Sequence, residues 1–146
     1  MTITVTPANA RSLALAHYAA RGVLEHVLSW HGITFQQQIV LRAATAVEAL
    51  TPTELVAEVQ GALKADPSDI RTTVEELVTQ GLLARTGAQL RVTQAGRDVF
   101  DAAATDTAPF SARIWDGIPD VDLAAAGRVL ALVAERANAE LAALTS

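Results

Sequence analysis

One segment of the sequence gathers the side chains best suited to contact a nucleic acid. A guanidinium can pair bidentately with guanine, and hydroxyl groups can donate to phosphates or meet a thymine methyl. Arg71 is the candidate base reader, and hydroxyl residues lie on both sides of it. The full candidate set is Ser68, Arg71, Thr72, Thr73, Arg85, Gln89 and Arg91. The chemistry that this set can support is the recognition of double-stranded DNA.

The charge balance around these residues is acidic. Segment 66–85 holds four acidic residues and two arginines, and the formal net charge of the whole chain is −5. Broad, charge-driven binding to nucleic acid needs Lys and Arg to neutralise phosphates, so only a small local basic patch is compatible with this balance. Asp66 and Asp69 would lie in the first turn of a helix, where negative charge is favourable. Glu75 and Glu76 would lie beyond the end that touches bases.

A second group of residues is suited to a small aromatic ligand. Aromatic rings with a polar edge fit an apolar aromatic molecule, and a histidine can hydrogen-bond a carboxylate or a phenol. The candidates are His17, Tyr18, Trp30, His31, Phe35 and Trp115. The alternative is that these side chains only pack where helices meet, with His17 at a core or interface position.

Several other chemistries have no basis in the sequence. There is no cysteine and no His-x-x-x-His pair, so we expect no metal site and no cofactor. There is no Gly-x-Ser-x-Gly motif and no phosphate-binding glycine loop, so we do not expect an enzyme. The opening MTITVTPANA lacks a basic start and an apolar run, and no segment is apolar enough to span a membrane. We therefore expect a cytoplasmic protein with no membrane partner.

Helix signals recur through the first half of the chain. Apolar residues at three- and four-residue spacing predict a helix over about 7–29, ended by Gly32. Thr34-x-x-Gln37 and Thr51-Pro-x-Glu54 are capping boxes that predict two further helix starts. A looser box, Asp66-Pro-x-Asp69, predicts a third, whose inner face would be Ile70, Val74 and Leu77 and whose end would be Gly81.

After Gly81 the spacing of apolar residues changes to one that is typical of strands. Segments 82–85 and 89–92 predict a hairpin around Thr86-Gly87-Ala88, after which Thr93 caps a helix into the Ala-rich 102–104. TDTAP at 105–109 predicts a break, 110–115 a short helix, and 117–119 a second break. Asp120 is the expected cap of a last helix with near-heptad apolar spacing, which suits helix pairing.

These elements predict a mainly α fold with a small β-hairpin wing. The fold class is a winged helix-turn-helix between long N- and C-terminal dimerisation helices. The expected domains are an N-terminal dimerisation helix over 7–31, a DNA-binding lobe over 34–104, and C-terminal dimerisation helices over 107–146. Few aromatic residues and many alanines favour an oligomer, because small side chains bury little area each.

The run VEELVTQGLLAR at 74–85, followed by LRVTQAG at 90–96, resembles the multiple-antibiotic-resistance-regulator (MarR) family of bacterial transcription factors. The family pattern is a recognition helix ending in Leu-x-x-x-Gly-Leu, a strand ending in Arg, a wing, and a Leu-x-x-Thr-x-x-Gly return. The motif spans about 74–96, and the layout nearly the whole chain. The wing tip here is shorter than in many members and lacks their Asp-Arg-Arg-like run.

The resemblance implies a function for both candidate sets. Members are homodimers with intertwined terminal helices, and many repress genes until a phenolic or other lipophilic effector binds between the dimer helices and the DNA-binding lobe. We therefore expect a homodimeric transcriptional regulator, a repressor, with an operator DNA and a small-molecule effector as partners. The alternative is a winged-helix protein-interaction module that no longer binds DNA, which the acidic balance and the short wing favour.

Overall fold

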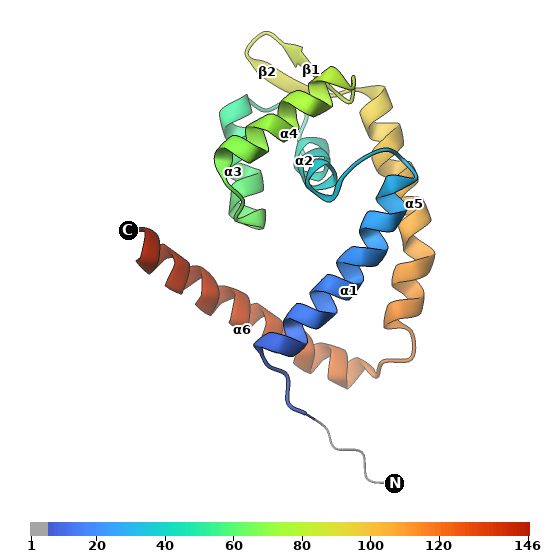
Figure 1. Cartoon of the computed structure of the whole chain (residues 1–146), viewed down its shortest axis with the longest axis vertical. Coiled ribbons are helices and arrows are strands. Elements are labelled where there is room, and N and C mark those ends of the chain that lie inside the picture. Colours follow the sequence, from blue (N-terminus) through green and yellow to red (C-terminus); the bar gives the residue numbers. More distant parts are fainter. Residues whose placement is uncertain (1–5) are drawn as a thin grey trace. The chain divides into compact units, whose positions relative to one another are not determined.

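Helices and one hairpin make up the part of the chain that the structure describes, residues 6–146 of a computed structural model (Figure 1). Their order matches the predicted winged helix-turn-helix. The elements are α1 Ala10–Ser29, α2 Phe35–Thr45, α3 Pro52–Leu63, α4 Pro67–Thr79, β1 Leu83–Thr86, β2 Gln89–Val92, α5 Gln94–Trp115 and α6 Asp120–Thr145. The chain divides into two units, the first ending at Phe110 and the second running Ser111–Ser146.

The helix starts follow the capping chemistry of the sequence. At α2 the Thr34 hydroxyl accepts from the amide of Gln37 at 3.1 Å, and the Gln37 side chain accepts from the amide of Thr34 at 3.0 Å. Thr51 and Glu54 form the same reciprocal pair at α3. Both predicted boxes are confirmed. At α4 only one half forms, because Asp66 accepts from the Ser68 amide at the second helical position.

The core of the first unit lies where α2, α3 and α4 contact one another. Ile70, Val74 and Leu77 are buried there, which confirms the predicted inner face of α4. The connection between α2 and α3 is also tied to the hairpin, because Leu50 and Leu90 exchange two backbone hydrogen bonds of 3.2 and 2.6 Å. The hairpin is therefore joined to the helical core by this backbone pairing as well as by the chain at its two ends.

The end of α4 at Gly81, which the sequence predicts, is a Schellman motif. Gly81 has a φ of +76°, and the amides of Leu82 and Gly81 donate to Leu77 and Val78 at 2.9 and 3.0 Å. The hairpin follows directly, with Thr86 opposite Gln89. Its two-residue turn begins with Gly87 at a φ of +63°, a position that favours glycine.

The return from the hairpin to α5 brings two backbone segments unusually close. Thr93 caps α5 as predicted, since its hydroxyl accepts from the Gly96 amide at 3.0 Å. The same hydroxyl donates to the carbonyl of Gly81 at 2.7 Å, and the Thr93 amide donates to Leu82 at 3.1 Å. A Cβ on Gly96 would lie only 2.2 Å from the Leu82 carbonyl oxygen. Glycine is therefore required at position 96 by the packing of α5 on the end of α4.

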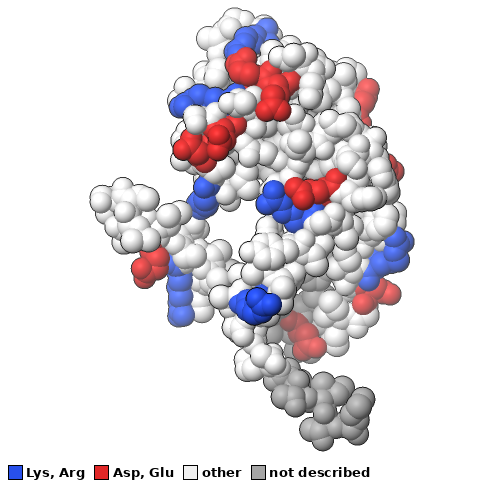
Figure 2. Space-filling view, in the orientation of Figure 1, with Lys and Arg blue, Asp and Glu red and all other residues white. Residues whose placement is uncertain are grey.

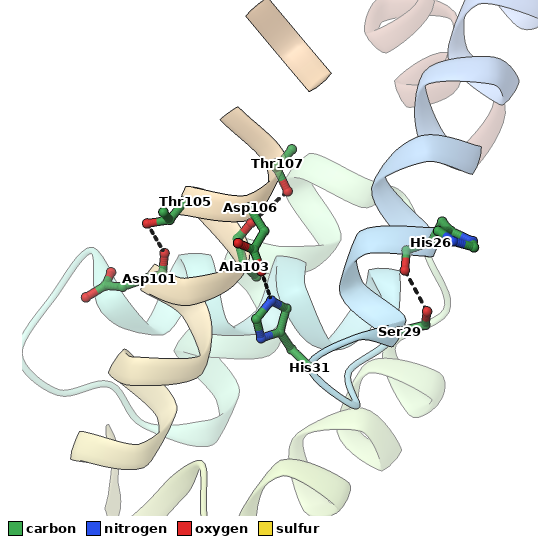
Figure 3. A network of polar contacts seen from close by, with 8 residues as sticks. All are labelled: His26, Ser29, His31, Asp101, Ala103, Thr105, Asp106 and Thr107. Carbon is green, nitrogen blue, oxygen red and sulfur yellow. Dashed lines mark hydrogen bonds and ion pairs between the residues drawn. The ribbon is translucent and has the colours of Figure 1, made fainter. Parts of the chain in front are cut away.

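The predicted break over 105–109 is wrong, because α5 continues without interruption to Trp115 with Pro109 inside it. A proline removes one backbone donor but does not by itself end a helix that other contacts hold. Such a contact exists here: Asp106 in this segment binds His31, which precedes α2, at 2.8 Å (Figure 3). A tertiary contact therefore outweighs the local break signal.

The second unit consists of the end of α5 and the long helix α6. Gly117 has a φ of +75°, so the break at 117–119 is confirmed. The expectation that Asp120 caps α6 is wrong, because Pro119 occupies the cap position and Asp120 is the first helical residue. Proline fixes a suitable φ there, and Asp120 and Asp122 still place negative charge in the first turn. No helix in residues 6–146 is long and apolar enough to cross a membrane.

Candidate nucleic-acid interface and ligand groove

The N-terminus of α4 is occupied by an internal carboxylate. Asp66 accepts from the Ser68 hydroxyl at 2.7 Å and from the Ser68 amide at 2.8 Å. These two hydrogen bonds, the hydroxyl first, lower the pKa of Asp66 below its usual 3.8. The cap is therefore fully present above pH 3.8 and is lost as the pH falls through the lowered pKa. The Ser68 hydroxyl, predicted to donate to a phosphate, already donates to Asp66.

The exposed face of α4 carries Arg71 and Thr72. Arg71 is in no ion pair with any described residue, and its charge lies near enough to Asp66 to contribute to the lowered pKa of that carboxyl. The Thr72 hydroxyl donates to the Ser68 carbonyl at 3.1 Å. Arg71 is therefore the one arginine of the predicted set that is in no ion pair with a described residue.

The expectation that Thr73 faces outward is wrong. Its exposed fraction is 6%, and its hydroxyl accepts from the Gln36 amide group at 2.9 Å and donates to the Asp69 carbonyl at 3.1 Å. Position 73 follows the buried Ile70 by three residues, which places it on the flank of α4 that faces α2. Thr73 fastens the recognition helix to α2 and is not placed to contact DNA.

The wing arginines each lie beside a carboxylate from outside the hairpin. Arg85 on β1 pairs with Glu75 on α4, and Arg91 on β2 pairs with Glu48 in the connection after α2, at 3.6 Å. Arg85 is paired with Leu90 in the hairpin, whereas Arg91 is opposite Ala84, so the two arginines point to opposite faces. The structure does not bring Arg71, Arg85 and Arg91 to one face. Gln89 is exposed at the start of β2.

The second glutamate of α4 also has a partner. Glu76 accepts from the side-chain amide of Gln37 at 3.1 Å, while the oxygen of the same Gln37 group caps α2. Neither glutamate of α4 is therefore an isolated charge. Figure 2 shows the result as acidic and basic side chains interleaved over the part of the first unit that carries α3, α4 and the hairpin.

The predicted ligand-binding residues of the first unit fall into separate contacts. His17 and Tyr18 are exposed on α1, with ring centroids 6.0 Å apart. His31 binds Asp106, and Phe35 lies under the Arg21 guanidinium at 4.1 Å. Trp30 contacts the rings of His26 and Phe110 at 5.8 and 6.1 Å. Trp115 is exposed in the second unit.

A groove of about 440 Å³ opens between α1 and the first unit's part of α5. None of the six predicted residues lines it, although Trp30 contacts two that do. Its walls are apolar except for one imidazole, and they are formed by Ala19, Gly22, Val23, His26, Val27 and Phe110. The α1 positions follow helical spacing, so they share one face. This spacing is the signal in the sequence that could have indicated the groove, although alanine and glycine offer a ligand no polar group of their own.

Metal-binding geometry is not found in residues 6–146, where no three His, Cys, Asp or Glu side chains gather. A polar contact links His31 to Asp106 on α5, where Thr105 and Thr107 also donate to carbonyls of their own helix (Figure 3). The contact between His31 and Asp106 joins α5 to the residues that precede α2.

The helix pair α3–α4 with an adjoining hairpin defines a winged helix-turn-helix protein. No family model matches the chain, and no curated protein matches it either. Solved structures do match, over most of the chain. A MarR family transcription regulator is similar with a TM-score of 0.73 and 24% identity, covering 91% of this chain and 87% of that chain.

Two further matches come from named regulators. CouR from Rhodococcus jostii, bound to p-coumaroyl-CoA, is similar with a TM-score of 0.71 and 25% identity over 84% of this chain and 88% of its own. Reduced MarR from E. coli is similar with a TM-score of 0.69 and 19% identity, covering 89% of this chain and 95% of that chain. The chain therefore has the fold of the MarR family, and this fold suggests a DNA-binding transcriptional regulator rather than an enzyme.

Proposed function

We propose that this protein is a homodimeric repressor that binds an operator DNA through α4 and the wing and is released by a small aromatic or lipophilic effector. The observation that carries the proposal is the exposed Arg71 on the N-terminal half of α4, beside a hairpin wing, in a fold that matches MarR family regulators. The N-terminal residues of a recognition helix are those that reach base edges in the major groove.

The homodimer is supported by apolar surface on the two terminal helices. On α1, Leu13, Leu15 and Tyr18 are exposed. On α6 no residue is buried, and the exposed large apolar side chains are Val121, Val129, Leu130, Leu132, Val133, Leu141 and Leu144. Apolar surface of this extent is typical of a protein–protein interface. The near-heptad spacing on α6 fits a second copy of the same helix.

The effector is supported by the groove along α1. A volume of about 440 Å³ with apolar walls fits a small aromatic molecule, and His26 supplies one hydrogen-bonding group to orient it. CouR, with the same fold, is bound to p-coumaroyl-CoA. Release would be a population shift, in which the effector favours a spacing of the two recognition helices that no longer matches successive major grooves.

The test of the proposed function combines mass and DNA binding. We expect sedimentation to give the mass of a dimer, and a labelled duplex of the DNA upstream of the protein's own coding region to bind in a salt-sensitive way. A phenolic acid from a small panel should weaken that binding. A monomer, or a duplex bound no better than an unrelated sequence, contradicts the proposal.

Replacing His26 with alanine should separate effector response from DNA binding. We expect the half-maximal phenolic acid concentration for DNA release to rise about three- to tenfold, because the one polar wall of the groove is lost. DNA affinity without effector should not change. His17→Ala is the matched control, since His17 lies outside the groove.

The outcome also decides between the groove and the residues predicted from sequence. If His17→Ala has the larger effect, the effector binds the exposed surface of α1 instead. If His26→Ala reduces the dimer mass, the groove belongs to the dimer interface and receives a helix of the second copy.

A second candidate function is a winged-helix protein-interaction module that no longer binds DNA. The ion pairs of Arg85 with Glu75 and of Arg91 with Glu48 favour it, because both wing arginines already have partners. The net charge of −5 favours it too. If the protein forms a stable dimer but binds no duplex in a salt-sensitive way, the result favours this alternative.

A further inference from the structure

We propose that Glu75 and Glu48 compete with DNA phosphates for the wing arginines and so limit the affinity of this protein for DNA. The inference rests on the proposed function, because it assumes that the wing approaches DNA. It goes beyond the proposed function by assigning a role to two acidic residues that a DNA phosphate would repel.

The geometry gives each wing arginine one internal acceptor. Glu75 projects from α4, and its Oε1 accepts from Nη2 of Arg85 across the gap to β1. Glu48 lies two residues before Leu50, whose backbone pairs with Leu90 beside Arg91. That pairing keeps the backbone near Glu48 beside β2, and Glu48 Oε1 lies 3.6 Å from Nη1 of Arg91. The fold therefore brings a carboxylate within reach of each wing arginine.

Both pairs are exposed enough for a phosphate to displace the carboxylate. The side chains of Arg85 and Glu75 are 45% and 59% exposed, and those of Arg91 and Glu48 are 46% and 85% exposed. Exposed ion pairs contribute little to stability and are screened by salt. A phosphate oxygen that takes the place of the carboxylate must break the existing pair, so a wing contact made in this way is weakened by the pair that it replaces.

The two glutamates should differ in how strongly they compete with a phosphate for their arginine. Glu75 is on a helix whose inner face is buried, so its backbone is fixed in the free and the bound protein. Glu48 is on a connection and is almost fully exposed, at the longer distance from its arginine. We expect Glu75 to be the stronger competitor, with Glu48 adding a smaller effect of the same sign.

The experiment is a salt titration of DNA binding with the full-length dimer. The probe is the labelled upstream duplex, titrated from about 50 to 200 mM salt. We expect Glu75→Gln to bind about two- to fivefold tighter at the lowest salt, the range that an exposed pair allows. The slope of log affinity against log salt should steepen by about one, because one more phosphate contact forms. Glu48→Gln should shift both quantities in the same direction by less.

Two controls separate competition from a general loss of negative charge. Glu58→Gln removes the same charge from α3, where Glu58 is exposed and in no ion pair with any described residue. It should change affinity by less than Glu75→Gln. In an Arg85→Ala background, Glu75→Gln should gain no more than the Glu58 control, because the arginine that it would free is absent.

The outcomes distinguish this inference from the proposed function. If the wild type binds and Glu75→Gln matches Glu58→Gln, or keeps its gain without Arg85, the inference is overturned and the proposed function stands. If neither the wild type nor Glu75→Gln binds any duplex in a salt-sensitive way, both are overturned. If only Glu75→Gln binds, the inference is supported in its strongest form.

Discussion

Replacing Gly96 with alanine is expected to reduce the free energy of unfolding by about 3 kcal/mol, at the upper end of what overpacking costs. The added Cβ would lie 2.2 Å from the Leu82 carbonyl oxygen and 3.1 Å from its carbon. Both are backbone atoms, so no side chain can rotate away. The start of α5 or the end of α4 must move, and with it the hydrogen bonds of Thr93 to Gly81 and Leu82. Urea unfolding followed by circular dichroism measures the loss.

Gly61→Ala is the matched control for that substitution. Gly61 lies inside α3, and a Cβ there meets nothing within 4 Å. Alanine is the better helix former, so this variant should gain about 0.5–1 kcal/mol. If Gly96→Ala is as stable as the wild type, the close approach of α5 to Leu82 does not exist in solution.

Replacing Arg71 with alanine is expected to have the largest effect on DNA binding. The loss should be about 1–3 kcal/mol for an arginine that reads a base. Arg71 is the exposed arginine on α4, and both wing arginines share their charge with a carboxylate. Fluorescence anisotropy with the upstream duplex measures the change. Arg42→Ala, which removes an exposed arginine from the end of α2, should have little effect.

Arg71→Lys decides what Arg71 recognises. A lysine keeps the charge but cannot form the bidentate pair with guanine. If Arg71 reads a base, the lysine variant should lose discrimination between the upstream duplex and an unrelated one. If it contacts only phosphate, the lysine variant should bind nearly as well as the wild type. Full affinity in Arg71→Ala contradicts the DNA-binding function of this face.

The elements of the fold could be predicted because their signals are local. A capping box such as Thr34-x-x-Gln37 needs only residues three apart, and the Schellman end at Gly81 needs a glycine followed by an apolar residue. The hairpin needs two short strands around a glycine turn. Each of these signals lies within one short segment of chain. Their order then indicated a winged helix-turn-helix, and the similar solved structures have that fold.

The continuity of α5 was decided by a long-range contact. The local signals of TDTAP favour a break, and they fail because Asp106 binds His31, a residue 75 positions earlier. Local rules carry no information on such a partner. The same limitation explains why the groove could not be predicted. In it, Phe110 joins five residues of α1 that are far from it in sequence.

By itself the sequence determined the order of the elements, the wing and a recognition helix with Arg71 on its outer face. Only the tertiary structure decided which candidate side chains are available on that surface. Thr73 is hydrogen-bonded to Gln36 of α2, the Ser68 hydroxyl donates to Asp66, and Arg85 forms an ion pair with Glu75. The physical reason is that a polar side chain binds the nearest partner that the fold presents. For Ser68 that partner is local, at the start of its own helix. For Thr73 and Arg85 it lies on another element, and the packing of the core decides where that element is.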